Sequence, residues 1–157
     1  VVNVLDNWDS YPMTGNNYYL FNNSESGRFE WIPWDLSWGG DPKKHLFDLG
    51  EFGLVESAPL YDNAMQVERY RIQYAAYVDL LSQFWFNYEN IYSKANAYHQ
   101  MIAPHVKQST GDKMFYGENA MFSIDEFNHS WQGLAEFARE RQKYIQDNLS
   151  TQLNQNQ

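Results

Sequence analysis

The chain of 157 residues contains no cysteine, which excludes disulfide frameworks, thiolate metal sites and cysteine nucleophiles. Basic residues are also scarce, because 11 Lys and Arg stand against 20 Asp and Glu and give a net charge of -9. Such an acidic chain is not expected to bind nucleic acid or an anionic membrane as its main partner. No apolar run approaches the roughly 20 residues of a transmembrane helix, so we also expect no membrane span.

Apolar and aromatic side chains are plentiful by contrast. Hydrophobic residues make up 43% of the sequence and aromatic residues 18%. This is enough for a packed core in one domain, or in a part of a larger one, over residues 1–150. Only residues 151–157, which are polar and rich in Gln and Asn, are expected to form a tail outside that core.

The N-terminal part of the sequence predicts β-structure. Residues 1–5 are a short apolar run of mostly β-branched residues, which is typical of a strand. A chain that begins inside a strand indicates that further sequence precedes it. Apolar residues 18–21 and 29–32 flank residues 22–28, which are rich in Asn, Ser and Gly. This pattern predicts a β-hairpin over about 18–32.

The pattern changes to a helical period further along the chain. Apolar residues recur every three or four positions along most of residues 57–150, which predicts helices there. Trp85 and Trp131 fall on these stripes and are expected in the core. We also expect a linker at Gly111–Gly117 and a capping box that starts at Ser123. A short β-hairpin followed by a mostly helical part is an α+β fold.

The open end of the predicted hairpin gathers polar side chains. If Phe21 faces Phe29, antiparallel pairing places Asn17 opposite Pro33. Asp35 then lies just beyond the end of the hairpin. We therefore expect Asn17 and Asp35 to lie close together.

Asp9 lies on the loop that enters the first hairpin strand and is expected to reach the same corner. Two Asp and one Asn offer only oxygen ligands, which suit a hard cation such as Mg²⁺. In protein kinases a catalytic Asp and an Asn likewise precede a short hairpin, and a metal-holding Asp follows it. Neither a His-Arg-Asp nor an Asp-Phe-Gly tripeptide occurs in this chain, so an ordinary protein kinase is excluded.

Three short motifs surround these positions. They are DNWDSY at residues 6–11, NNYYLF at residues 16–21 and WIPWD at residues 31–35. Their order and spacing resemble the spore-coat CotH kinase family. Residues 58–70 and 136–144 also resemble a helix entry and the terminal helix of that family. The resemblance therefore covers most of the chain.

The resemblance implies the C-terminal part of an atypical protein kinase in the spore coat, at the cell surface or outside the cell. Such a kinase transfers the γ-phosphoryl group of ATP to Ser or Thr of coat-type or secreted proteins. By motif position, Asp9 looks like the catalytic base, while Asp35 and Asn17 look like the ligands of Mg²⁺ or Mn²⁺. The adjacent Asn16 remains an alternative to Asn17 as a ligand.

Two features depart from the family pattern. Many members carry a second acidic residue two positions after the Asp of the last motif, where this chain has Ser37. The family's N-terminal nucleotide lobe, with its phosphate-contacting Lys, has no counterpart in these residues. We therefore expect that lobe upstream in the same protein, and we expect this fragment alone to be inactive.

Other functions stay open at this point. An inactive kinase-like scaffold is compatible with the two departures. A carbohydrate-binding module could use Trp8, Trp34 and Trp38, because flat aromatic rings stack on sugars. A glycoside hydrolase could use Asp9 and Asp35 as an acid/base pair, which requires one carboxyl group with a raised pKa.

Overall fold

The computed structural model describes residues 2–36, 40–47, 58–110, 113–116 and 119–155. Its elements are, in order, α1 (Val2–Leu5), α2 (Tyr11–Thr14), β1 (Tyr18–Asn23), β2 (Arg28–Pro33), α3 (Pro59–Met65), α4 (Glu68–Phe84), α5 (Tyr88–Thr110), β3 (Lys113–Tyr116), β4 (Asn119–Ser123) and α6 (Ile124–Gln155). A two-stranded antiparallel hairpin precedes a mainly helical part, which confirms the predicted α+β class. Among the described helices, none combines the length and the apolar character that crossing a bilayer requires.

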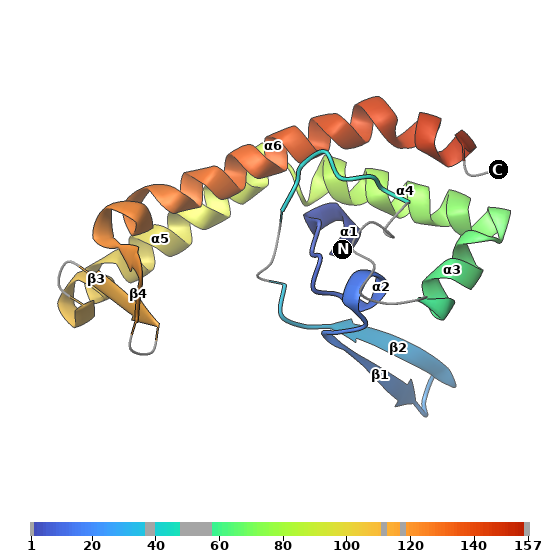
Figure 1. The fold of residues 1–157 in the computed structure, drawn as a ribbon, viewed down its shortest axis with the longest axis horizontal. Helices are drawn as coiled ribbons and strands as arrows, with labels where there is room; N and C mark the ends of the chain where they lie inside the picture. Colours follow the sequence, from blue (N-terminus) through green and yellow to red (C-terminus); the bar gives the residue numbers. More distant parts are fainter. Residues whose placement is uncertain (1, 37–39, 48–57, 111–112, 117–118, 156–157) are drawn as a thin grey trace.

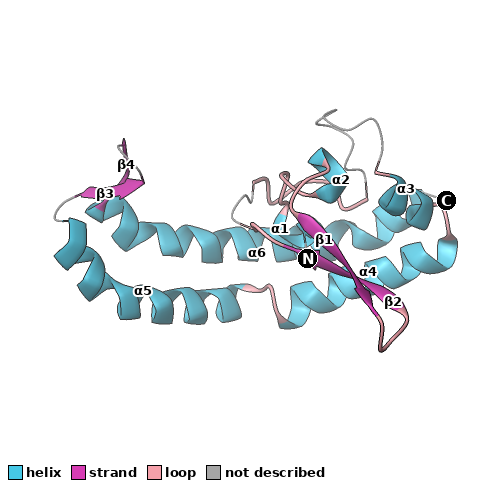
Figure 2. Cartoon of the chain, turned by 90° about the horizontal axis from the view of Figure 1, so that it is seen from below, coloured by secondary structure: helices cyan, strands magenta, loops and turns pink. Residues whose placement is uncertain are grey.

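The long helix α6 organises the helical part of the molecule. Helices α4 and α5 follow one another along it, and the β3–β4 hairpin lies at the far end of the α5–α6 pair (Figure 1). The β1–β2 hairpin projects away from α6, beyond α1 and α2 (Figures 1 and 2). The buried core lies between α1, α4, α6 and the segment that precedes α3. Its members are Val4, Leu46, Phe47, Ala75, Val78, Phe86, Ala138 and Ile145.

The β1–β2 hairpin forms as predicted, but its register differs by one residue. Phe29 pairs with Asn22, so the expected pairing of Phe29 with Phe21 is wrong. The tight turn explains the shift. Gly27 has a φ of 65° and donates its N–H to the carbonyl of Asn23 at 2.9 Å. A left-handed residue at this place is easily adopted by glycine and lets the strands extend closer to the turn.

Alternation along the two strands gives the hairpin two different faces. Tyr18, Trp31 and Pro33 share one face, where the Trp31 ring stacks on Tyr18 with 4.4 Å between ring centroids. Tyr19 and Ile32 lie on the opposite face, and Tyr19 is 62% exposed. Among the described residues, the face that carries Trp31 packs against Tyr11 of α2, whereas Tyr19 on the opposite face stacks on Trp34.

The expected strand over residues 1–5 is wrong. The described part of this run forms the short helix α1. Val4 is buried in the core, and the carbonyls of Asn3 and Val4 accept hydrogen bonds from Arg141. This tertiary environment overrides the strand preference of β-branched residues, which depends on context.

Two further expectations about the C-terminal part are also wrong. The expected linker Gly111–Gly117 contains β3, which pairs with β4. The polar segment after residue 150 is not a tail outside the core, because α6 continues to Gln155. Gln152 is buried there and accepts a hydrogen bond from the Leu46 N–H at 2.9 Å. Buried polar side chains are tolerated when they are paired in this way.

The two helical tryptophans differ in their surroundings. Trp85 forms the C-cap of α4 and is 62% exposed, so its expected burial is wrong. Trp131 is half-buried and packs against Tyr92 and His99. The capping box expected at Ser123 depends on a side chain outside the described residues, although α6 does begin at the next residue.

Candidate active site

Three side chains hold the carboxylate of Asp9 between α1 and α2. Its Oδ1 accepts hydrogen bonds from Thr14 at 3.0 Å and Asn16 at 3.1 Å, and its Oδ2 accepts one from Asn17 at 2.9 Å. The bond from Asn16 lowers the pKa of Asp9 most, partial burial opposes it, and Thr14 and Asn17 lower the pKa further. The carboxylate is therefore fixed in position and stays ionised into the acid range.

Asn17 joins the Asp9 loop to the open end of the hairpin. Its Nδ2 also donates to the Asp9 carbonyl at 2.7 Å, and its own carbonyl accepts the Trp34 N–H at 3.1 Å. Asn17 has a φ of 58°, in the left-handed region that Asn tolerates better than most residues. The chain can therefore turn sharply from α2 into β1 and keep the amide of Asn17 aimed at Asp9.

Asp35 follows the last pair of the hairpin and is exposed. Its φ is 50°, and among the described residues the other non-glycine positions with positive φ are Asp6 and Asn17. All three lie in this part of the molecule. Uncommon backbone conformations of this kind gather at functional sites, where the surrounding structure has to hold them in place.

Asn7 connects the two predicted aspartates, and the sequence analysis did not identify it. Its Oδ1 accepts the Asp9 N–H at 3.1 Å, and its Nδ2 donates to the Asp35 carbonyl at 3.0 Å. The residue is fully buried. One side chain thus fixes the backbone at Asp9 and at Asp35 together. The signal was present in the DNWDSY motif, but a buried asparagine cannot be told from a loop asparagine by sequence.

The donor atoms near Asp9 limit the kind of cation that can bind. Within the described residues, no group of three or more His, Cys, Asp or Glu gathers as a metal site. Asn17 Oδ1 points away from Asp9, because Nδ2 donates to the Asp9 carboxylate. The backbone of Asp35 is fixed by Asn7, and its carboxylate is on an exposed residue. Mg²⁺ commonly uses one or two protein oxygens and completes its shell with water and phosphate, so this donor set fits it.

The predicted tryptophans contribute differently to this region. Trp34 is 47% exposed and stacks on Tyr19, with 6.1 Å between ring centroids. Trp8 is half-buried. Trp38 and Ser37 lie outside the described residues.

Comparison with known proteins identifies the family. A family model described as "CotH kinase protein" matches residues 1–145. The chain belongs to the CotH family. Among curated proteins, the "Inner spore coat protein H" of Bacillus subtilis (strain 168) is 25% identical over 146 residues, which are 92% of this chain and 37% of that protein. The chain thus spans little more than a third of this CotH relative, and no solved structure matches it.

We expect Asn7→Ala to loosen the Asp9 loop and the Asp35 turn together. The variant loses two hydrogen bonds and leaves a buried N–H and a carbonyl without these partners. The free energy of unfolding should fall by about 2 kcal/mol, since each such bond contributes about 1 kcal/mol. Urea unfolding checks this, with Asn63→Ala on the exposed side of α3 as the matched control. Equal stability of the two variants would show that Asn7 does not hold the site.

Proposed function

We propose that this chain forms the phosphoryl-transfer part of an atypical protein kinase, which moves the γ-phosphoryl group of ATP to a Ser or Thr hydroxyl of a protein. Membership of a family named for kinases supports this proposal. The observation that carries it is the ionised carboxylate of Asp9, held by three side chains and linked through Asn7 to Asp35. Because the matched relative is named as a spore coat protein, we expect a location in the spore coat or at the cell surface.

Asp9 would act on the acceptor hydroxyl. As the hydroxyl oxygen bonds to the γ-phosphorus, the bond from phosphorus to the bridging oxygen of ADP breaks, and Asp9 takes the hydroxyl proton. A carboxylate with a lowered pKa is a weak base, so its larger contribution is to orient the hydroxyl before transfer. The hydrogen bonds from Asn16, Thr14 and Asn17 keep its oxygens in a fixed direction for that purpose.

Asp35 and Asn17 would hold Mg²⁺ or Mn²⁺. The bound cation would neutralise charge on the phosphates of the nucleotide. Asn17 is a better candidate than Asn16, because it bonds Asp9 twice and is tied through its carbonyl to the Trp34 N–H. The position of Asn17 therefore depends on both segments of the site.

The proposed activity belongs to the natural full-length protein, because the family resemblance implies a nucleotide lobe in addition to these residues. The test is incorporation of labelled phosphate from ATP into Ser/Thr proteins, with and without Mg²⁺. We expect transfer that a chelator abolishes. If neither transfer nor a shift in melting temperature on adding ATP occurs, the protein is an inactive scaffold and the proposal fails.

The direction of the Asp9 pKa argues against the glycoside hydrolase alternative. That chemistry needs a general acid with a raised pKa, whereas the pKa of Asp9 is lowered. The pKa of Asp6 is raised by burial, but this carboxylate is 5% exposed and accepts the Asp41 N–H at 2.7 Å. A sugar could not reach it.

Replacing Asp35 with Asn should raise the Mg²⁺ concentration needed for half-maximal phosphate transfer. Removing one carboxylate from a two-residue donor set weakens cation binding by about tenfold or more, judged from the 10–100-fold effects of changes around metal sites. The backbone carbonyl that Asn7 bonds is unchanged by this substitution. A Mg²⁺ dependence identical to that of the unmodified protein would exclude Asp35 as a ligand.

The acid limb of the pH–rate profile should move to higher pH in Asn16→Ala. Asn16 is the largest cause of the lowered pKa of Asp9, so its removal brings that pKa closer to the ordinary value of about 3.9. Activity requires the ionised form and is lost as pH falls through the pKa. Likewise, the stability that this lowered pKa contributes is present above about pH 4 and is lost as pH falls through the folded-state pKa. Initial rates across the acid range test this, with Asn63→Ala as the control. An unchanged acid limb would show that Asp9 does not control it.

A further inference from the structure

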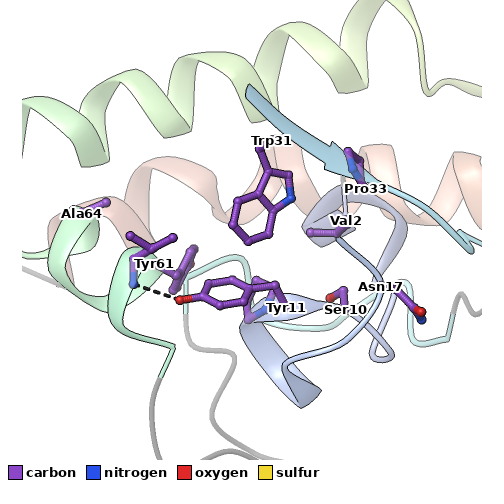
Figure 3. Close-up of a pocket in the computed structure, with 10 residues that line it drawn as sticks. Val2, Ser10, Tyr11, Asn17, Trp31, Pro33, Tyr61 and Ala64 are labelled. Atoms are coloured by element: carbon purple, nitrogen blue, oxygen red, sulfur yellow. Dashed lines mark hydrogen bonds between the residues drawn. The ribbon is translucent and has the colours of Figure 1, made fainter. Parts of the chain in front are cut away.

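A pocket of about 250 Å³ lies under the inward face of the β1–β2 hairpin. It separates β2 from α3, and α1 and α2 close its base (Figure 3). The Trp31 and Tyr11 rings are neighbours in the pocket wall (Figure 3), with 4.7 Å between their centroids, and they face the pocket together. The lining residues are Val2, Ser10, Tyr11, Pro12, Asn17, Trp31, Pro33, Leu60, Tyr61 and Ala64.

Two hydroxyl groups of this pocket already have partners in the structure. Ser10 donates its hydroxyl to the Asn7 carbonyl at 2.6 Å, and the Tyr11 hydroxyl accepts the Leu60 N–H at 3.0 Å (Figure 3). The Trp31 ring is held by Tyr18 on one side and by the edge of Tyr11, at 4.7 Å between centroids. The pocket is therefore mainly apolar, and its aromatic walls pack against one another.

The size and charge of the pocket restrict its occupant. Its 250 Å³ exceeds the roughly 150 Å³ of a cavity that binds benzene and falls below the roughly 300–1,000 Å³ of sites for drug-sized ligands. It therefore fits one bulky side chain. None of its described lining residues is basic, and the chain carries a net charge of -9, so an anionic ligand is disfavoured.

The pocket adjoins the proposed base directly. Asn17 lines the pocket and also donates to the Asp9 carboxylate. Ser10 and Tyr11, which directly follow Asp9 in the sequence, line the pocket as well. We infer that the pocket receives a bulky apolar or aromatic side chain of the protein substrate, near the Ser or Thr that is phosphorylated. The inference rests on the proposed function, because it places the substrate chain across Asp9.

A nucleobase is a poorer occupant than an apolar side chain. A buried purine needs hydrogen-bond partners for its ring nitrogens and amino group, whereas the lining is mainly apolar and its Ser10 and Tyr11 hydroxyls are already bonded within the protein. Trp34, which directly precedes Asp35, stacks on Tyr19 on the opposite face of the hairpin. The aromatic residue next to Asp35 therefore lies on the other face of the hairpin from the pocket.

The test compares Ser peptides that carry a single Phe or Ala at each position within three residues of the acceptor. The natural full-length protein should prefer one Phe peptide by about tenfold or more in kcat/KM, the effect expected from burying a large apolar side chain. Ala64→Leu fills the pocket and should abolish the preference. Leu60→Glu, at a 56% exposed position, places a carboxylate at the pocket and should do the same without endangering folding. Ala97→Leu on the exposed side of α5 is the matched control and should keep the preference.

Direct binding of the same peptides, followed by fluorescence anisotropy without ATP, separates the two proposals. If Phe peptides bind more tightly than Ala peptides and Ala64→Leu removes the difference, the pocket assignment holds even where no phosphate is transferred. If phosphate is transferred without any preference, and neither pocket variant changes peptide binding, the pocket assignment is wrong and the kinase proposal stands. If ADP displaces the Phe peptide and Ala64→Leu raises the KM for ATP instead, the pocket belongs to the nucleotide and the inference is overturned.

Discussion

Replacing Asp9 with Asn should reduce kcat for phosphate transfer by about 10²–10⁴-fold, the contribution typical of a positioned acid or base. The substitution keeps the size of the side chain and an oxygen that can accept hydrogen bonds. It removes the negative charge that orients the acceptor hydroxyl and receives its proton. Because Asp9 is half-buried in a loop and makes its contacts with polar neighbours, the fold should survive the change.

The measurement compares single-turnover transfer by Asp9→Asn and by Asp125→Asn in the natural full-length protein. Asp125 lies in the first turn of α6, and its side chain is 89% exposed. That end of α6 adjoins the β3–β4 hairpin and lies away from the β1–β2 hairpin (Figure 1), so the variant should transfer phosphate at the normal rate. Melting temperatures confirm that both variants are folded. A normal rate with Asp9→Asn would remove this residue from the reaction and, with it, the main support for the proposed chemistry.

Local sequence signals were sufficient to predict the hairpin, whose open end is closed by the bond from the Trp34 N–H to the Asn17 carbonyl. The turn residues around Asn23 and Gly27 mark the reversal of the chain, and this alone predicts that Asn17 and Asp35 approach one another. The register was off by one because the turn is tighter than its composition indicates. Asp9 meets Asn17 in spite of the error, since both flank α2 and their contact does not depend on strand pairing.

The missed features depend on contacts between residues that are distant in sequence. The helix α1 lacks a helical pattern of its own and packs against α4 and α6. By sequence, Asn7 cannot be distinguished from an exposed loop residue. Its role is evident only from its burial and its hydrogen bonds to Asp9 and Asp35. By sequence, Arg141 is only one residue of the segment 136–144 that resembles a terminal helix. In the structure it connects α6 to the backbone of α1.

Arg141 is fully buried in α6 and bonds the backbone of two separate segments. Its guanidinium donates to the carbonyls of Asn3 at 2.6 Å and Val4 at 3.1 Å. It also donates to the carbonyls of Pro42 and Lys44. Burial lowers the pKa of Arg141, and the nearby charge of Asp6 opposes that effect. The planar fork of an arginine can serve several acceptors that a lysine could not reach at once.

We expect Arg141→Met to lower the free energy of unfolding by about 3–5 kcal/mol, as for the loss of one partner from a buried charged network. Four carbonyls lose their donor, and Asp6 loses one of its two nearby positive charges, while that of Lys44 remains. Urea unfolding of the natural full-length protein measures the effect. Arg139→Met is the matched control on the same helix, because Arg139 is exposed, pairs with Glu136 at 2.7 Å and places its guanidinium 3.8 Å from the centroid of the Tyr88 ring. That surface ion pair contributes about 0–1 kcal/mol. An exposed cation–π contact of this kind contributes about 0.5–1 kcal/mol.

A second substitution at the same position, Arg141→Lys, tests how the candidate active site is supported. Arg141 bonds the carbonyls of Asn3 and Val4. These residues shortly precede Asn7, whose side chain accepts the Asp9 N–H. If α6 holds the site through this contact, Arg141→Lys should lose phosphate transfer at temperatures where the helices remain folded by circular dichroism. Arg139→Lys should lose neither. Loss of activity only together with global unfolding would restrict Arg141 to a role in stability, and equal stability of the two Met variants would refute its role in the fold.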